Sequence, residues 1–92
     1  MNVKDKVVII TGGGRGIGFG ISAAYAKAGA KLVITGRTES TLLEAKEKLE
    51  AYGTSVLTVT ADGADEAAIK NVIAKTVETY GKIDVVVNNA QA

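Results

Sequence analysis

The sequence predicts an α/β fold: a doubly wound parallel sheet in which strands and helices alternate as βαβαβαβ. Short runs of apolar, β-branched residues alternate along the chain with longer segments in which apolar residues recur at helical spacing. Parallel strands need connections of about a dozen residues or more, and the helical segments have this length. Proline is absent, and the 11 glycines follow apolar runs rather than forming a linker. Residues 1–92 are therefore expected to belong to a single domain.

The first three elements are a strand, a helix and a strand. The first strand is expected at Val7–Ile10, where four β-branched residues precede a glycine-rich turn. The first helix, Ile17–Ala28, is rich in Gly and Ala, and its small side chains suit close packing of a helix on a sheet. The second strand is expected at Lys31–Thr35, which ends at a glycine.

The remaining elements repeat this alternation. Apolar residues at helical spacing predict a second helix over residues 42–52, and a third strand follows at Ser55–Thr60. The third helix is expected at Asp65–Tyr80 and the fourth strand at Ile83–Val87. The third helix has the clearest periodicity, carried by Ile69, Val72, Ile73, Thr76, Val77 and Tyr80.

The expected strand order is 3-2-1-4, a Rossmann-type arrangement in which growth of the sheet reverses after the third strand. Right-handed crossovers then place helices on both faces. The fourth strand becomes an edge, although its run Val85–Val87 is continuously apolar, a pattern typical of a strand covered on both faces. The sheet is therefore predicted to be incomplete. Because an apolar edge favours pairing with another chain, we expect a homo-oligomer, or completion of the sheet by further sequence.

Composition excludes several classes of function. The net charge is +1 and the basic residues are spread along the chain, so a nucleic-acid partner is not expected. The sequence has neither cysteine nor histidine, which excludes disulfides, zinc sites and every Ser-His or Cys-His nucleophile. The apolar run after Met1–Lys6 is too short for a signal peptide or a membrane span. We therefore expect a cytoplasmic protein with no membrane partner and no metal site.

A glycine-rich turn, Thr11–Gly18, lies between the first strand and the first helix, where a dinucleotide pyrophosphate meets a helix N-terminus. Gly12 is expected to supply the tight turn, Gly16 to let the backbone approach phosphate, and Gly18 to let the helix pack on the strand. The alternative is a plain flexible loop, but five glycines in seven positions exceed what a loop needs. The spacing is Gly-x-x-x-Gly-x-Gly, and no Gly-Lys-Ser/Thr follows it, so a nucleotide-hydrolysing phosphate loop is not indicated.

The end of the second strand indicates which dinucleotide binds. An NAD site has a carboxylate here that accepts from the ribose 2′-hydroxyl, whereas this chain has Arg37. Arginine can bind a 2′-phosphate bidentately, and Arg15 of the glycine turn is expected to help. NADP(H) is thus favoured over NAD(H), with solvated surface charges as the alternative for both arginines. Asp62, after the third strand, is expected either to accept from the adenine amino group or to cap the third helix.

These residues, with Asn88-Asn89-Ala90 after the fourth strand, resemble the short-chain dehydrogenase/reductase family over the whole chain. The resemblance implies that the backbone of Gly12–Ile17 holds the pyrophosphate and that Arg37 holds the 2′-phosphate. It also implies that Asn88 stabilises the centre of the sheet. Asp62 and Gly63 would hold the adenine, and Asn89 and Ala90 the ribose. The residues expected at the cofactor are Gly12, Gly14, Arg15, Gly16, Ile17, Gly18, Arg37, Asp62, Gly63, Asn89 and Ala90.

Two features depart from the family pattern. Gln91 stands where the family usually has a glycine after Asn-Asn-Ala. The family's catalytic serine and Tyr-x-x-x-Lys pair follow this region, and none of Tyr25, Tyr52 and Tyr80 has a lysine four positions later. All three tyrosines are expected in the core. No catalytic residue is therefore assigned in this chain.

The function expected from these observations is the N-terminal, cofactor-binding part of an NADP(H)-dependent short-chain oxidoreductase. Such an enzyme moves a hydride between nicotinamide and a small alcohol or carbonyl substrate. The 92 residues alone, a truncated form of that enzyme, are expected to be inactive. The alternatives are a half-domain that binds a dinucleotide without catalysis, and a self-associating folding unit that binds no nucleotide.

Overall fold

The computed structural model of the chain describes residues 2–62 and 65–89. Strands and helices alternate in the predicted order, and most predicted ends agree within two residues. The elements are β1 (Val7–Thr11), α1 (Gly16–Lys27), β2 (Lys31–Gly36), α2 (Glu39–Glu50), β3 (Val56–Thr60), α3 (Glu66–Tyr80) and β4 (Val85–Asn88). Within the described residues, no helix has the length and apolarity that crossing a membrane requires.

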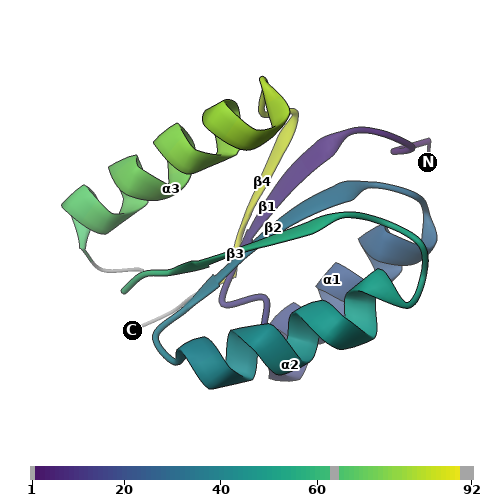
Figure 1. Cartoon of the computed structure of the whole chain (residues 1–92), viewed down its shortest axis with the longest axis horizontal. Coiled ribbons are helices and arrows are strands. Elements are labelled where there is room, and N and C mark those ends of the chain that lie inside the picture. Colours follow the sequence, from purple (N-terminus) through teal and green to yellow (C-terminus); the bar gives the residue numbers. More distant parts are fainter. Residues whose placement is uncertain (1, 63–64, 90–92) are drawn as a thin grey trace.

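The four strands form one parallel sheet in the order β3-β2-β1-β4, which confirms the predicted topology. In register, Val8 of β1 lies between Leu32 of β2 and Val85 of β4. Figure 1 shows α1 and α2 on one face of the sheet and α3 on the other. The face changes because growth of the sheet reverses direction after β3 while the crossovers keep the same hand.

The core consists of two layers, one on each face of the sheet. Alternate residues of a strand point to opposite faces, so Val8 and Ile10 pack with the α1 and α2 side chains and Ile9 packs with α3. This explains why β1 reads as a continuous apolar run. Leu42 and Leu49 of α2 are fully buried, and burying each contributes about 2 kcal/mol.

The β4 edge is less covered than the rest of the sheet, as the sequence predicts. Among the described strands β4 pairs with β1 alone, and Val86 is 59% exposed. On α3, Val72 and Thr76 are buried, whereas Ile69, Ile73 and Val77 are exposed although they belong to the same apolar periodicity. The apolar face predicted for α3 is thus wider than the face that the sheet covers.

The prediction that all three tyrosines lie in the core is wrong for Tyr52, which is 48% exposed. Helix α2 ends at Glu50, and Gly53, at φ 93°, turns the chain away, so Tyr52 lies beyond the helix. Its ring lies 5.4 Å from the Lys27 ammonium. The other two rings are half-buried, and burial raises the pKa of the Tyr80 hydroxyl.

Asp84 ties the start of β4 to the start of β1. Its carboxylate accepts a 2.8 Å hydrogen bond from the Val7 N–H, and its own N–H donates to the Val7 carbonyl at 2.9 Å. The Lys82 ammonium lies 3.0 Å from the same carboxylate. The Val7 N–H first, and Lys82 next, lower the pKa of the Asp84 carboxyl below its ordinary value of 3.8.

Asp84→Asn is expected to lower the free energy of unfolding at neutral pH and to lose this effect in acid. A pKa lowered by folding stabilises the protein above the unfolded pKa, and this stabilisation is lost as the pH falls through the folded pKa. Urea unfolding at neutral pH and in steps down to about pH 2 should show the two proteins converging. Glu47→Gln, at an exposed position of α2, is the control and should match wild type. A deficit of Asp84→Asn that persists in acid would contradict this explanation.

Candidate functional site

The predicted site residues lie at one edge of the sheet because the carboxyl ends of parallel strands all lie at the same edge. The glycine turn follows β1, Arg37 follows β2, Asp62 follows β3 and Asn89 follows β4. The order of the strands reverses between β1 and β4, and ligands of open α/β sheets bind at such a switch point.

The turn after β1 leads directly into the N-terminus of α1. Gly12 and Gly16 have φ values of 67° and 58°, a region that favours glycine. Arg15 is the N-cap of α1, and its side chain makes no capping hydrogen bond. The first N–H groups of a helix lack partners within the helix and carry partial positive charge. The start of α1 therefore suits an anionic group.

The glycines of this turn serve different purposes. At Gly16 an added Cβ would meet no atom within 4 Å, so the backbone faces open space. At Gly18 the same Cβ would overlap the Gly12 carbonyl oxygen, which confirms that Gly18 permits close packing of α1 on the strand end. At Gly13 it would lie 2.8 Å from Ile34 Cγ2. Gly13 was not predicted as a structural residue, because its neighbour Ile34 is remote in sequence.

Ser22 also shapes the turn and was missed by the sequence analysis. Its buried hydroxyl lies 3.1 Å from the carbonyl oxygen of Gly13 and 2.9 Å from that of Gly18, and it donates to them. A lone serine among the Gly and Ala residues of α1 was the available signal. The hydroxyl therefore holds the turn from its buried side, whereas the backbone at Gly16 faces open space.

The turn after β4 is hydrogen-bonded to the turn after β1. The Asn89 N–H donates to Thr11 Oγ1 at 2.9 Å, and Asn89 Nδ2 donates to the Gly12 carbonyl at 3.4 Å. Thr11 Oγ1 also donates to Asn88 Oδ1 at 3.2 Å. Asn88 thus links β4 to β1, and Asn89 holds the glycine turn. Ala90, the other residue expected at the ribose, lies outside the described residues.

Asp62 does not cap α3, so this alternative for its role is wrong. The cap is Asp65, whose Oδ1 accepts from the N–H groups of Ala67 at 2.9 Å and Ala68 at 3.4 Å. The Asp62 carbonyl accepts from the Asp65 N–H at 2.9 Å. Gly63, expected beside Asp62 at the adenine, lies outside the described residues.

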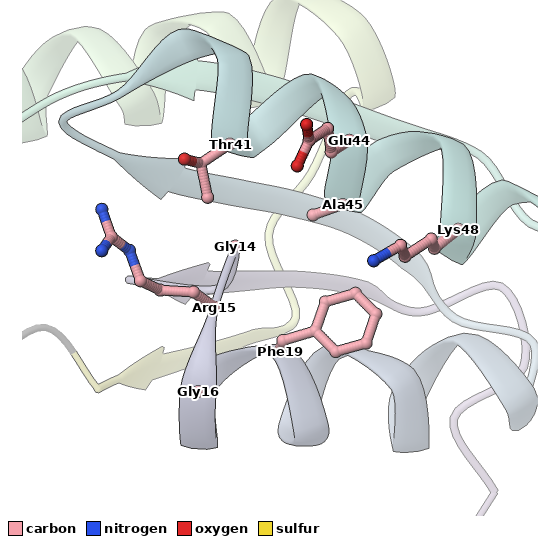
Figure 2. Close-up of a pocket in the computed structure, with 8 residues that line it drawn as sticks. All are labelled: Gly14, Arg15, Gly16, Phe19, Thr41, Glu44, Ala45 and Lys48. Atoms are coloured by element: carbon pink, nitrogen blue, oxygen red, sulfur yellow. The ribbon is translucent and has the colours of Figure 1, made fainter.

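A pocket of about 290 Å³ opens between the glycine turn and α2, and Figure 2 shows the residues around it. Arg15 lines it, whereas Arg37 lies just before α2 and does not. Both arginines are exposed, and within the described ranges neither has a carboxylate at ion-pair distance. The lining residues are Gly14, Arg15, Gly16, Phe19, Thr41, Glu44, Ala45 and Lys48. The last five were missed. Four of them belong to α2, which approaches the turn only in the folded chain, and Phe19 belongs to α1.

The family follows from comparison with known proteins. Residues 6–92 match the family model described as short chain dehydrogenase. The chain belongs to the short-chain dehydrogenase family. Within the part of the chain that the structure describes, no three acidic side chains cluster as a metal site would require.

The relatives of this chain are longer proteins. A 12alpha-hydroxysteroid dehydrogenase from a Clostridium species is 52% identical, over all of this chain and 39% of the relative. The L-sorbose reductase of Gluconobacter frateurii, solved in complex with NADPH and L-sorbose, has a TM-score of 0.95 and 35% identity, over all of this chain and 36% of that one. The glucose dehydrogenase of Caenorhabditis elegans, an apo structure, has a TM-score of 0.91 and 37% identity, over 99% of this chain and 40% of that one. The chain thus spans little more than a third of their length.

Proposed function

We propose that this chain is the NADP(H)-binding part of a short-chain oxidoreductase. The whole protein moves a hydride between nicotinamide and a small alcohol or carbonyl substrate. The observation that carries this proposal is the open glycine turn at the carboxyl edge of the sheet, with Arg15 and Arg37 exposed beside it and lacking ion pairs among the described residues. When bound, the nicotinamide supplies or accepts the hydride, and the residues of this chain bind and orient the cofactor.

The turn fits a pyrophosphate on physical grounds. Gly16 leaves room for a phosphate against the backbone, and Ser22 holds the turn from behind. Backbone N–H groups of Gly12–Ile17, at the positive end of α1, would donate to the phosphate oxygens. Gly14 packs against α2, because a Cβ there would lie 3.1 Å from Leu42 Cδ2. A larger residue at position 14 would push α2 away from the turn.

The adenosine half of the cofactor is assigned to the ends of β2, β3 and β4. Arg37, with Arg15, would hold the 2′-phosphate, since guanidinium groups pair bidentately with phosphate oxygens. Asp62 and Gly63 would hold the adenine. Asn89 and Ala90 would line the ribose. Support comes from the shared edge on which the described members of this set lie.

The catalytic groups are assigned to sequence outside these residues. No tyrosine of the chain has the Tyr-x-x-x-Lys spacing, so the 92 residues alone are expected to bind NADPH without reducing a carbonyl. We propose that the whole protein is a cytoplasmic homo-oligomer acting on a small molecule. The intact mass of the natural protein tests this. A mass near 9.4 kDa would favour the non-catalytic half-domain, and a mass nearer that of the relatives should be followed by an assay of NADPH-dependent carbonyl reduction.

Gly16→Val tests the turn as the cofactor site and is expected to weaken NADPH binding by at least about tenfold. The branched side chain would occupy the open space beside the turn, and a β-branched residue is strained at φ 58°. Binding is measured by the change in NADPH fluorescence. Stability is measured in parallel by urea unfolding.

Gly53→Val is the matched control for backbone strain. Gly53 has φ 93°, has no atom within 4 Å of an added Cβ, and lies between α2 and β3 at the opposite edge of the sheet. This variant should lose stability as Gly16→Val does and keep wild-type affinity for NADPH. A folded Gly16→Val protein that binds NADPH as tightly as wild type would exclude the turn as the site.

The exposed β4 edge favours a second candidate, self-association of the chain. A strand edge with apolar side chains pairs readily with another strand, and Val86 and the exposed α3 residues Ile69, Ile73 and Val77 offer apolar surface for burial. Val86→Lys is expected to weaken self-association at least about tenfold in sedimentation equilibrium. Leu43→Lys, at a 48% exposed leucine on α2, is the control. Equal effects of both variants would exclude β4 as the interface.

A further inference from the structure

The pocket between the glycine turn and α2 contains charges that the assignment of Arg15 and Arg37 does not use. Lys48 and Glu44 line it from successive turns of α2. In Figure 2, Arg15 and Lys48 lie at opposite ends of the pocket, and Glu44 lies between them on the α2 side. The pocket is thus lined by two cationic side chains and one carboxylate.

The charge of Lys48 is not neutralised within the described residues. Its ammonium lies 6.0 Å from the centre of the Phe19 ring, a contact that leaves the positive charge in place. Glu44 precedes it by four residues, the favourable spacing for a helical ion pair, yet the two charged groups are not at ion-pair distance in the described structure. Both side chains therefore act on the pocket as separate charges.

We propose that Lys48 and Glu44 adjust the preference for NADP(H) over NAD(H) electrostatically, Lys48 strengthening and Glu44 weakening the attraction for the 2′-phosphate. This inference rests on the proposed cofactor site. From Thr41, which Figure 2 shows toward the Arg15 end of the pocket, to Lys48 is seven helical steps, about 10 Å along α2. This is close to the Debye length at 0.1 M ionic strength, about 10 Å. The attraction between Lys48 and the 2′-phosphate should therefore act through space, strengthen at lower salt and weaken at higher salt. Neither residue needs to contact the cofactor.

Lys48→Gln is expected to weaken NADPH binding about threefold at about 10 mM ionic strength and to leave NADH binding nearly unchanged. The 2′-phosphate adds charge that NADH lacks, so the two cofactors respond differently. At about 1 M ionic strength, where the Debye length is about 3 Å, the difference from wild type should disappear. Lys46→Gln is the matched control and should have a clearly smaller effect, because it removes the same charge from α2 at a position that does not line the pocket.

Glu44→Gln is expected to act in the opposite direction, tightening NADPH binding about twofold to threefold at low salt. Glu47→Gln, one turn along α2 and outside the pocket lining, is its control. All four variants replace exposed or half-buried side chains with glutamine, a good helix former. Thermal unfolding should therefore match wild type. Titrations of the chain with NADPH and NADH measure the affinities.

Three results would overturn the inference: equal effects of Lys48→Gln and Lys46→Gln, equal losses for NADPH and NADH, or weaker NADPH binding by Glu44→Gln. The underlying assignment of the NADP(H) site is tested separately, by the affinities of the wild-type chain for NADPH and NADH. A wild-type chain that binds NADPH no more tightly than NADH at low salt would reject the NADP(H) site, and this inference with it. Opposite, salt-dependent shifts of the two pocket variants, confined to NADPH, would support the inference.

Discussion

Gly18→Ala is expected to lower the free energy of unfolding by about 3 kcal/mol and to abolish nucleotide binding. The added Cβ would overlap the carbonyl oxygen of Gly12 and lie 2.6 Å from Asn89 Nδ2. These two atoms form the hydrogen bond that joins the turn after β4 to the turn after β1. Because the Gly12 oxygen belongs to the backbone, relief of the overlap must move either the turn or the start of α1.

Gly20→Ala is the matched control, two residues further along the same helix. An added Cβ at Gly20 meets no atom within 4 Å, and alanine in a helix interior is favoured over glycine by about 1 kcal/mol. The two substitutions are thus expected to change stability in opposite directions in urea unfolding. A Gly18→Ala protein as stable as Gly20→Ala would show that the close packing of α1 on the turn has been misjudged.

Arg37→Asp is expected to reverse the cofactor preference, weakening NADPH binding about 100-fold while NADH binding is kept or improved. Hydrogen bonds between charged groups contribute about 1.5–3 kcal/mol, and the carboxylate adds repulsion of the 2′-phosphate. At the end of β2, the same carboxylate can accept from the ribose hydroxyl of NADH. Arg37 is exposed, so its replacement should leave the core intact. Titration with both cofactors measures the ratio of affinities.

Lys4→Asp makes the same change of charge before β1, at the opposite edge of the sheet. It should affect both cofactors slightly and equally, because its distance from the site exceeds the screening length in physiological salt. An equal loss of NADPH and NADH binding by Arg37→Asp would contradict the assignment of Arg37 to the 2′-phosphate. It would indicate that Arg37 supports the turn as a whole.

The element order, the parallel sheet and the strand order could be predicted because each rests on local periodicity or on general connection rules. The first four residues of β1 are apolar and buried, as expected for a strand that is covered on both faces. On α3, the buried side is marked by Val72 and Thr76. The prediction that Tyr52 lies in the core was wrong because it extended a local periodicity too far. Its spacing continues the periodicity of α2, but the helix ends at Glu50, and no local pattern shows which residue of a periodic run is the last inside the helix.

The position of the candidate site could also be predicted from local sequence, because a glycine-rich turn that follows a strand and precedes a helix lies at the carboxyl edge of a parallel sheet. Contacts between remote residues decided the rest. They distinguish open Gly16 from packed Gly18 and Gly13, and they bring α2 against the turn to form the pocket. Packing of this kind depends on where distant segments meet in space, which the spacing of residues along the chain does not specify.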